Sequence, residues 1–449
     1  MCHHLHPERG RMVSMLNTTD LRGRALNIAE ALPRAEQDIT ATLDKVTPIL
    51  EQVRTGGTEA LLDLSEKFDG VRPEALRVPN EVLERSLAEL DPAVRRALDA
   101  LVVRAREVHT AQLPAASLVS PGPDARVTNR WVPVERVGLY VPGGQAVYPS
   151  SVVMNVIPAQ VAGVTQLAIA SPPQRDFGGW PHPTVLAAAH LLGVDEVYAV
   201  GGAQAVGMFA YGAADGAGEA TVAPVSLITG PGNVYVATAK RAVQGTVGID
   251  SEAGPTEIMV VADSTASAHF IAADLVSQAE HDELAAAVLV TDSPELAQRV
   301  SSQVTDQAAA AKHSERIQKS LSGRQSAILL VDSMDVAVQV ANAYGAEHLQ
   351  IMTSDDDALA DRIHNAGAVF LGAYTPVSLG DYCAGSNHVL PTGGASRYSS
   401  GLNVTSFMRS QQVIRYGRDG LAQVAEHVTA LAEAEHLPAH GQAVRARYA

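Results

Sequence analysis

The feature that most constrains the fold is an alternation of short apolar runs with helical segments, which begins near residue 136. Each run is long enough for one strand and leads through a turn rich in Gly or Pro into a segment with helical spacing. The runs are VGLYV (137–141), QLAIAS (166–171), EVYAV (196–200) and SLITG (226–230). This pattern is typical of a parallel sheet with helices on both faces.

A second series of the same kind follows the first. Helical segments again separate its apolar runs, which are EIMVVAD (257–263), AAAVLVT (285–291), SAILLVD (326–332), LQIMT (349–353) and AVFLG (368–372). We therefore predict an α/β fold with two Rossmann-like parallel-sheet domains, residues 136–255 and 256–402. An internal duplication would explain their similar architecture.

Segments of different character flank the two domains. Residues 15–135 show apolar spacings of three and four, with a break at Gly56–Gly57 and a helix start at Asp91–Pro92. They predict a helical N-terminal segment that packs on the α/β domains and ends in the polar link PAASLVSPGPDARVTNR. Residues 403–449 also have a helical pattern but are too few to bury a core of their own, which predicts a helical C-terminal arm.

The first residues carry side chains that bind metals. Cys2, His3, His4 and His6 stand close together, but they precede the first segment with a folding pattern, and Met15 opens a more ordinary start. We therefore predict that residues 1–14 form a disordered leader without chemistry of its own.

Composition excludes several classes of protein. Hydrophobic residues make up 46% of the 449 residues, yet no run approaches the ~18 apolar residues that a membrane helix needs. The formal net charge of −16 disfavours nucleic-acid binding, which needs a basic surface. The two cysteines, Cys2 and Cys383, cannot supply a disulfide framework. We predict a cytoplasmic protein that binds neither membranes nor nucleic acid.

Three turns that follow strands of the first domain are rich in glycine. They are YVPGG (140–144), VGGAQA (200–205) and TGPGN (229–233). Glycines at such turns let backbone amides approach a phosphate at a helix N-terminus. None is a G-x-G-x-x-G or P-loop motif, and tight-turn geometry alone explains any single one. Three along the carboxyl edge of one sheet favour a dinucleotide.

Polar side chains mark the second domain instead. Glu347 and His348 are adjacent between a helix and a strand, and such a pair transfers protons near neutral pH, although a solvated loop would account for one such dipeptide. In SQAEHDE (277–283), Gln278 and His281 would share a helix face. With Asp381 and His440 they offer oxygen and imidazole donors without a thiolate, a set that suits Zn²⁺ or a similar divalent ion in a catalytic rather than a structural role.

Spacing alone does not select these four residues as ligands, because the chain contains fifteen histidines. Cys383, two residues after Asp381, is better explained as a small buried hydrophobe than as a nucleophile.

Eight motifs in a fixed order carry a specific resemblance. They are GLYVPGG, GGAQA, GPGN, AGPTE, SQAEH, EHL, GDYCAGSNHVLP and LPAH. In this order the chain, from about residue 20 to its end, closely resembles the histidinol dehydrogenase family.

The resemblance implies roles for particular residues. The family's zinc ligands fall on Gln278, His281, Asp381 and His440. Its acid–base pair falls on Glu347 and His348. Its substrate contacts fall on Thr256, Glu435, His348 and the four metal-site residues. Its NAD contacts fall on Tyr140, Gln204 and Asn233, one in each glycine-rich turn.

The resemblance also implies the reaction and the assembly. Members oxidise L-histidinol to L-histidine through histidinal, in two hydride transfers to NAD, with one Zn²⁺ per subunit. They are homodimers with shared active sites, in which the arm crosses to the partner, so that Glu435 and His440 would complete the neighbouring site. Two departures are small: Thr256 stands where many members have Ser, and Ala346 where Pro is frequent.

Two other classes fit parts of the pattern. A zinc hydrolase would use the same Glu and His with a metal-bound water and no NAD. A non-catalytic nucleotide-binding scaffold would use the glycine-rich turns alone. Formation of NADH from L-histidinol and NAD⁺ distinguishes both from a dehydrogenase.

Overall fold

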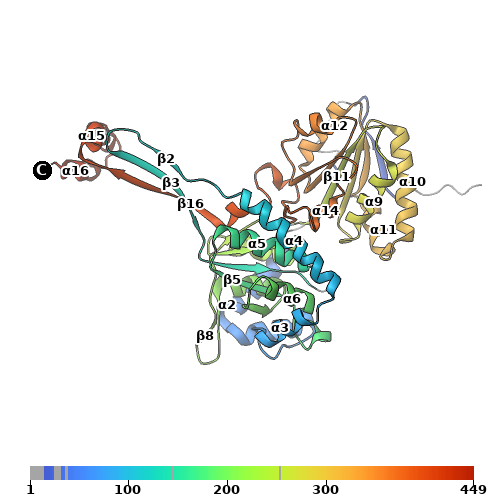
Figure 1. The fold of residues 1–449 in the computed structure, drawn as a ribbon, viewed down its shortest axis with the longest axis horizontal. Helices are drawn as coiled ribbons and strands as arrows, with labels where there is room; N and C mark the ends of the chain where they lie inside the picture. The colour runs from blue at the N-terminus through green and yellow to red at the C-terminus, as the bar shows by residue number, and fades with distance from the viewer. Residues whose placement is uncertain (1–14, 25–31, 36–38, 144–145, 252–253, 449) are drawn as a thin grey trace, which may run out of the picture.

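A computed structural model describes residues 15–24, 32–35, 39–143, 146–251 and 254–448. It confirms the predicted α/β fold: two lobes, each built around a parallel sheet, and a long arm that extends away from both of them (Figure 1). The proposed leader, residues 1–14, and its cysteine and histidines lie outside the described residues.

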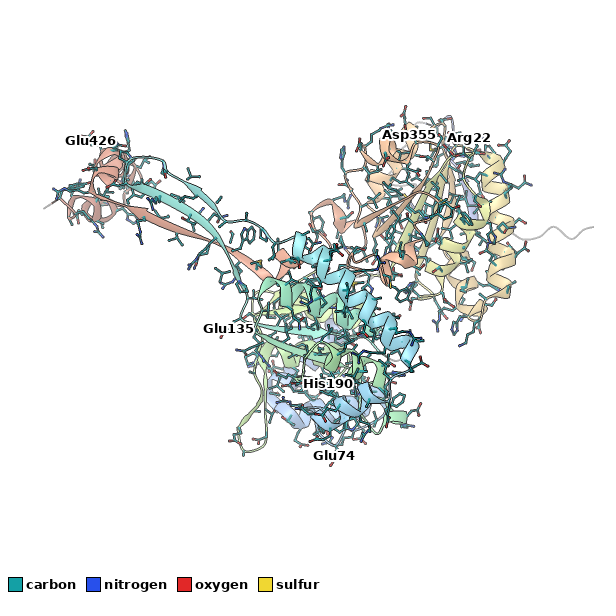
Figure 2. The ribbon with its side chains drawn as sticks, viewed as in Figure 1. Arg22, Glu74, Glu135, His190, Asp355 and Glu426 are labelled. Atoms are coloured by element: carbon teal, nitrogen blue, oxygen red, sulfur yellow. The ribbon has the colours of Figure 1, made fainter. Side chains whose placement is uncertain are left out.

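Charged side chains are exposed on both lobes and on the arm (Figure 2). Glu74, Glu135, Asp355 and Glu426 are exposed examples (Figure 2). Among the described residues, no helix combines the length and hydrophobicity that a membrane crossing requires.

The first domain is a five-stranded parallel sheet in the order β10-β9-β4-β5-β6. Its strands are β4 (Arg136–Tyr140), β5 (Gln166–Ser171), β6 (Val197–Ala199), β9 (Leu227–Thr229) and β10 (Gly248–Ile249). Its helices are α5 (Pro149–Ala162), α6 (Pro183–Leu191), α7 (Gly202–Tyr211) and α8 (Val234–Val243). The strands and helices follow the predicted runs and turns.

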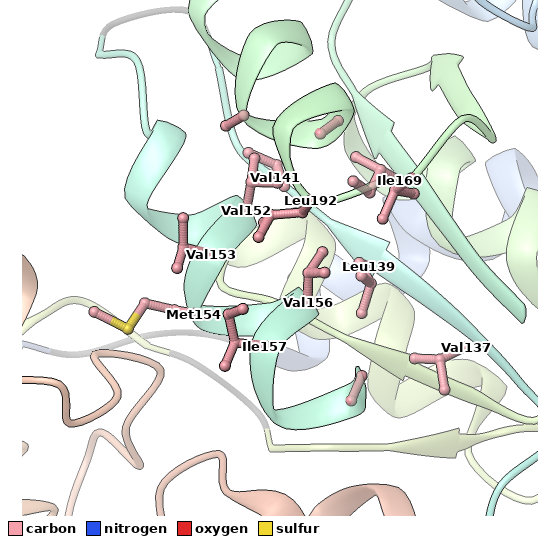
Figure 3. Close-up of a cluster of buried hydrophobic side chains, with 14 of the residues drawn as sticks. Val137, Leu139, Val141, Val152, Val153, Met154, Val156, Ile157, Ile169 and Leu192 are labelled. Carbon is pink, nitrogen blue, oxygen red and sulfur yellow. The ribbon is translucent and has the colours of Figure 1, made fainter. Parts of the chain in front are cut away.

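Alternation along the strands gives each face of this sheet its own core. On one face, Val137, Leu139 and Val141 pack with residues of α5 such as Val152 and Ile157 (Figure 3). Tyr140 points to the opposite face, into the core that α7 and α8 cover. Both faces of the strands are therefore buried, as their nearly continuous apolar sequences require.

Three N-terminal helices pack onto the helices of the first domain. They are α2 (Ile39–Asp69), α3 (Asn80–Ala88) and α4 (Pro92–Ala111). Helix α2 lies against α7 and α8, α3 lies against α6, and α4 lies against α5. The predicted break appears as a kink in α2 at Gly57, where φ is +54° and an added Cβ would collide with the backbone of Ala214. The predicted start of α4 is also confirmed, since the Asp91 carboxylate accepts hydrogen bonds from the first amides of the helix.

The second domain is a six-stranded parallel sheet in the order β1-β13-β12-β11-β14-β15. Its strands are β1 (Asn17–Asp20), β11 (Glu257–Ala262), β12 (Ala286–Thr291), β13 (Ala327–Leu330), β14 (His348–Met352) and β15 (Ala368–Leu371). Its helices are α9 (Ala268–Ala279), α10 (Pro294–Ala310), α11 (Ser314–Ser322), α12 (Met334–Tyr344), α13 (Asp356–Ala360) and α14 (Val377–Asp381). The edge strand β1 is an addition that the helical interpretation of the N-terminal segment does not contain.

The arm contains the expected helices and also an antiparallel sheet. Strands β2 (Ser117–Val119), β3 (Ala125–Pro133) and β16 (Met408–Tyr416) form its shaft, and α15 (Arg418–Ala434) and α16 (Pro438–Arg445) form its tip (Figure 1). Pairing of β3 with β16 joins segments about 280 residues apart, for example through the 2.8 Å hydrogen bond from Arg130 to Gln411. The polar link and the start of the C-terminal tail therefore become one structural unit.

Short elements complete the chain. They are the hairpin β7 (Ala213–Ala214) and β8 (Ala220–Val222) and the 3₁₀ turns at Arg175–Phe177, Ala395–Arg397 and Val404–Phe407.

Candidate active site

A cleft of about 420 Å³ lies between the two α/β domains. The first domain contributes the turns after β4 and β9 and the start of α5, through Pro142, Tyr148, Ser150, Ser151 and residues 231–234. The second domain contributes Thr256, His281, Glu347, His348, Asp381 and His388 among others. Most of the residues predicted for the second domain therefore line one cavity.

The two domains present opposite ends of their strands to this cleft. In the first domain the lining turns follow the carboxyl ends of β4 and β9, as expected for an open α/β sheet. In the second domain, Thr256 precedes β11 and Glu347 precedes β14, so the site lies at the amino ends of these strands. The carboxyl-end rule therefore predicts the site in the first domain only.

Glu347 is buried at the point where the chain enters β14. The preceding helix α12 ends at Gly345, whose φ of +59° turns the chain towards the strand. The Glu347 Oε2 atom accepts hydrogen bonds from Thr256 Oγ1 at 2.6 Å and from the backbone amide of Glu257 at 2.9 Å. Burial raises the pKa of the Glu347 carboxyl, although the nearby His348 ring opposes this effect. A buried carboxylate with a raised pKa has the properties of a general base.

His348 is the first residue of β14 and is also buried. Its Nδ1 atom lies 3.1 Å from the carbonyl oxygen of Glu257, which can only accept a hydrogen bond. The proton of a neutral ring therefore resides on Nδ1, and Nε2 keeps a free lone pair. Nε2 lies 3.9 Å from Asp381 Oδ1, so this lone pair is directed to the part of the cleft where Asp381 lies.

The three metal-ligand candidates of the second domain come from two elements. Gln278 is buried on the last turn of α9, and its Nε2 donates a 2.6 Å hydrogen bond to Thr256 Oγ1. His281 lies two residues beyond the helix, after a turn closed by its amide and the Gln278 carbonyl, and it is more exposed. Asp381 ends α14, with its Oδ2 3.9 Å from His281 Nε2.

A buried polar pair underlies these elements. Asp274, one turn before Gln278 on α9, is buried close to Gln350 of β14 and to the backbone amide of Val377 at the start of α14. Burial raises the pKa of Asp274 to about 6, and these two neighbouring groups oppose the shift. This pair links the three elements that carry Gln278, His348 and Asp381.

His388 is a cleft residue that the sequence interpretation missed. Its Nδ1 faces the carbonyl oxygen of Asp381 at 3.1 Å, and its Nε2 lies 2.9 Å from Ser151 Oγ on α5. Burial lowers the pKa of the His388 ring, which favours the neutral form. His388 therefore joins the two domains across the floor of the cleft. The signal was available, because His388 lies in the motif GDYCAGSNHVLP that contains Asp381.

The predicted NAD contacts surround the glycine-rich turns but differ in exposure. Asn233 is exposed, lines the cleft and caps α8 through its Oδ1. Tyr140 is buried, and its hydroxyl accepts a 3.1 Å hydrogen bond from the amide of Gly202, where α7 begins. Gln204 is buried on the first turn of α7. Within this chain, Tyr140 supports the Gly201–Gly202 turn through this hydrogen bond, Gln204 is buried just after the turn, and Asn233 reaches the cleft.

The two remaining predicted residues lie elsewhere. Glu435 directly follows α15 and His440 belongs to α16, so both are at the tip of the arm, away from the lobes (Figure 1). Within the described part of the chain, no three His, Cys, Asp or Glu side chains form a group that could hold a metal ion. A single chain places His281 beside Asp381, and Gln278 beside Thr256 one turn earlier, without the fourth predicted ligand.

The fold and the cleft define a two-domain α/β protein with a buried Glu–His pair in the cleft between the domains. A sequence profile of the histidinol dehydrogenase family matches residues 32–448. Histidinol dehydrogenase from Thermobifida fusca is 59% identical over 436 residues, which cover 97% of this chain and 98% of the relative. The enzyme from Mycobacterium tuberculosis is 57% identical over 437 residues, with coverage of 97% and 98%.

A solved structure agrees with these sequence relatives. The crystal structure of histidinol dehydrogenase from Elizabethkingia anophelis superposes with a TM-score of 0.91 at 30% identity, over 98% of this chain and 99% of that one. The chain belongs to the histidinol dehydrogenase family and is an NAD-dependent oxidoreductase. This membership decides against the zinc hydrolase and the non-catalytic scaffold.

Proposed function

We propose that the protein oxidises L-histidinol to L-histidine through histidinal, with two successive hydride transfers to NAD. The observation that carries the proposal is the buried pair Glu347 and His348 in the cleft between the domains, in a chain of this family. The reaction needs a base for an alcohol and a base for water, and the two side chains offer one each. We assign the reaction to the cytoplasm, where histidine biosynthesis is expected and where a chain with two cysteines keeps them reduced.

His348 is the base for the first oxidation. Its Nε2 lone pair takes the hydroxyl proton of histidinol while the carbon-bound hydrogen leaves as hydride. The carbonyl of Glu257, at 3.1 Å from Nδ1, keeps the ring in the tautomer that this step requires and stabilises the imidazolium that forms.

Glu347 is the base for the second oxidation. Its Oε2 is occupied by two donors, Thr256 Oγ1 and the Glu257 amide, so Oε1 is the oxygen available to accept a proton. Water adds to the aldehyde carbon of histidinal, and its proton passes to Glu347. The hydrate then loses a hydride and a proton and becomes the carboxylic acid.

The donor set fits a zinc ion. Gln278 donates its Nε2 hydrogen to Thr256, which leaves the amide oxygen as the free ligand atom. Together with His281, Asp381 and His440 of the partner subunit it would give two oxygen and two imidazole ligands. When bound, the ion holds the amine and imidazole of the substrate and orients the hydroxyl-bearing carbon. Thr256, Glu435 and His348 would complete the substrate contacts.

The glycine-rich turns are proposed to bind NAD. Those after β4 and β9 border the same cleft as Glu347 and His348, so a dinucleotide bound at this edge presents its nicotinamide to the substrate. We assign contacts to Asn233 at the start of α8, and to Tyr140 and Gln204 at the turn that opens α7.

The position of the arm and its exposed apolar side chains are an argument for a homodimer with shared active sites. It carries Glu435 and His440 away from the cleft of its own chain (Figure 1). Large apolar side chains remain exposed on it, namely Leu118, Val119, Ile414 and Leu431. A three-stranded sheet without a covered face is marginal by itself, so the arm gains stability by packing on a second subunit.

Absorbance of NADH tests the proposed function. The purified protein, given zinc, L-histidinol and NAD⁺, should produce two NADH per histidinol and accumulate histidine. A chelator should abolish the activity and zinc should restore it. Absence of NADH from a folded, zinc-loaded protein would overturn the proposal.

A further inference from the structure

Arg34 contacts two chain segments close to the proposed catalytic pair, the start of β11 and the end of α12. Its Nη1 donates a 3.1 Å hydrogen bond to Glu257 Oε1 at the start of β11. Its guanidinium carbon lies 4.2 Å from the ring centroid of Tyr344, the last residue of α12, and its Nη2 donates to the Tyr344 carbonyl oxygen. Arg34 therefore joins the start of β11 to the end of α12.

Glu257 connects Arg34 to both catalytic side chains. Its backbone amide donates to Glu347 Oε2 at 2.9 Å, and its carbonyl faces His348 Nδ1 at 3.1 Å. The side chain of the same residue receives Arg34. A displacement of Glu257 would consequently move the hydrogen-bond partners of Glu347 and His348 together.

Burial makes this arrangement sensitive to the loss of Arg34. The side chain of Glu257 is 7% exposed and that of Arg34 27%. Burial raises the pKa of the Glu257 carboxyl to about 7, the charge of Arg34 opposes the shift, and the charge of Glu347 adds to it. Glu257 Oε2 and the Tyr344 hydroxyl are buried without a hydrogen-bond partner among the described residues. Without Arg34, a buried carboxylate beside Glu347 would lose its counter-charge.

We propose that Arg34 is a positioning residue that holds Glu257 and Tyr344 in place and thereby orients Glu347 and His348 for both oxidations. The inference rests on the proposed function, because it assumes that this pair transfers the protons. Arg34 itself lies behind the pair, and the cleft-lining residues do not include it. Its effect is thus expected on turnover, whereas binding of NAD, which uses the first domain, stays unchanged.

Three substitutions and one double variant test this role. Arg34→Met should lower kcat by about 10- to 100-fold, the cost of a catalytic group displaced by a fraction of an ångström to about 1 Å, with KM for NAD unchanged. Arg34→Lys should recover part of kcat, because an ammonium pairs with Glu257 but cannot also stack on Tyr344 and donate to its carbonyl. Glu257→Gln should lower kcat too, and the double variant Arg34→Met/Glu257→Gln should lose little more than Arg34→Met, since both residues act as one unit.

A matched control separates positioning from general stability. Arg136 forms another partly buried ion pair, with Glu196, at the start of β4 and remote from the cleft. Arg136→Met should lower the melting temperature without a comparable loss of kcat. In Arg34→Ala, millimolar guanidinium should restore activity, and urea, a neutral molecule of similar shape, should not. Chemical rescue by the cation alone is not expected of a merely structural residue.

The outcomes distinguish this inference from the proposed function. If the wild-type protein forms no NADH from histidinol, the proposed function fails. If the wild type is active and Arg34→Met keeps its kcat, or Arg136→Met loses as much, or guanidinium does not rescue Arg34→Ala, the positioning role fails by itself.

Discussion

The hydroxyl of Thr256 is joined to the carboxylate of Glu347 by a hydrogen bond of 2.6 Å. The direction of this bond is fixed, because the same hydroxyl oxygen accepts a 2.6 Å hydrogen bond from the amide nitrogen of Gln278, which can only donate. Thr256 therefore orients the proposed base on one side and the proposed metal ligand on the other. A serine provides the same hydroxyl, which explains how either residue can serve at this position.

Replacing Thr256 with Val should affect both neighbours. Hydrogen bonds to charged groups contribute about 1.5–3 kcal/mol, so turnover of supplied histidinal should fall roughly 10- to 100-fold. Zinc affinity should fall as well, because the Gln278 amide becomes free to rotate. Thr256→Ser is the matched control and should stay near wild type in both rate and affinity. A Thr256→Val protein with unchanged zinc affinity would contradict the orienting role towards Gln278.

His281→Ala should lose bound zinc together with activity. The His281 side chain is exposed beyond the end of α9, so its removal should change stability by no more than about 0.5 kcal/mol. The control is His269→Ala, which removes an exposed histidine near the start of the same helix, hydrogen-bonded to Gln303. Metal analysis of both purified variants decides the assignment. Full zinc occupancy in His281→Ala would show that His281 is not a ligand.

Glu347→Gln should separate the two oxidations. The amide keeps acceptor capacity for Thr256 and for the Glu257 amide but cannot take a proton from water. Loss of a general base costs ~10²–10⁴-fold, so oxidation of supplied histidinal should slow by this factor. The first hydride transfer, followed in a single turnover with histidinol, should change far less because His348 serves as its base. Equal slowing of both steps would reject the division of roles.

Asp69 should make the stability of the protein depend on pH. It ends α2, its Oδ2 is buried without a hydrogen-bond partner among the described residues, and burial raises its pKa from 3.8 to about 6. A raised pKa means that the folded state holds the proton more tightly, so this group destabilises the fold progressively as pH rises from about 4 to 6. Asp69→Asn removes the effect and should stabilise the protein at pH 8.

Urea unfolding at two pH values measures this effect. The advantage of Asp69→Asn over the wild type should be greater at pH 8 than at pH 5 by about 1–1.5 kcal/mol, as follows from a shift of this size. Asp44→Asn, which removes an exposed carboxylate from the same helix, should give no such difference. An advantage of Asp69→Asn that is the same at both pH values would exclude a titrating Asp69 as its cause.

The sequence predicted the parts of the fold that are encoded locally. The buried strands of both sheets are continuous apolar runs. Asp91 acts locally through its side-chain cap of α4, and Gly57 through its positive φ. Strands β3 and β16 were not predicted because they mix polar and apolar residues without a continuous apolar run, and they exist through pairing with each other, about 280 residues apart. Strand β1 has only four residues and is held in the sheet by its parallel pairing with β13.

The same distinction holds for the candidate site. The glycine-rich turns and the Glu347–His348 dipeptide are visible in the sequence, whereas the grouping of Thr256, Gln278 and Asp381 around them depends on the family resemblance. His388 lies in the motif that contains Asp381, but its importance arises from contacts with Ser151 on another domain and with the carbonyl of Asp381, which the motif does not reveal. The role proposed for Arg34 likewise follows from tertiary contacts alone.

Subunit mixing tests whether each active site is shared between two chains. His440 lies at the arm tip, and the cleft residues His281 and Asp381 lie in the second domain, so one chain does not unite them (Figure 1). In a two-fold symmetric dimer, both arms can reach the partner reciprocally. The variants His440→Ala and His281→Ala should each be inactive by themselves. Their mixed dimer, however, places both defects in one site and leaves the other site intact.

Mild unfolding of the two inactive variants together, followed by refolding, should therefore restore activity. Random pairing makes half of the dimers mixed, and half of their sites are intact, so recovery should approach about a quarter of the wild-type level. Each variant refolded alone is the control and should stay inactive. If His440 instead acts within its own chain, every site in a mixed dimer keeps one defect. Mixed dimers that are demonstrably present but inactive would thus leave a site built within one subunit.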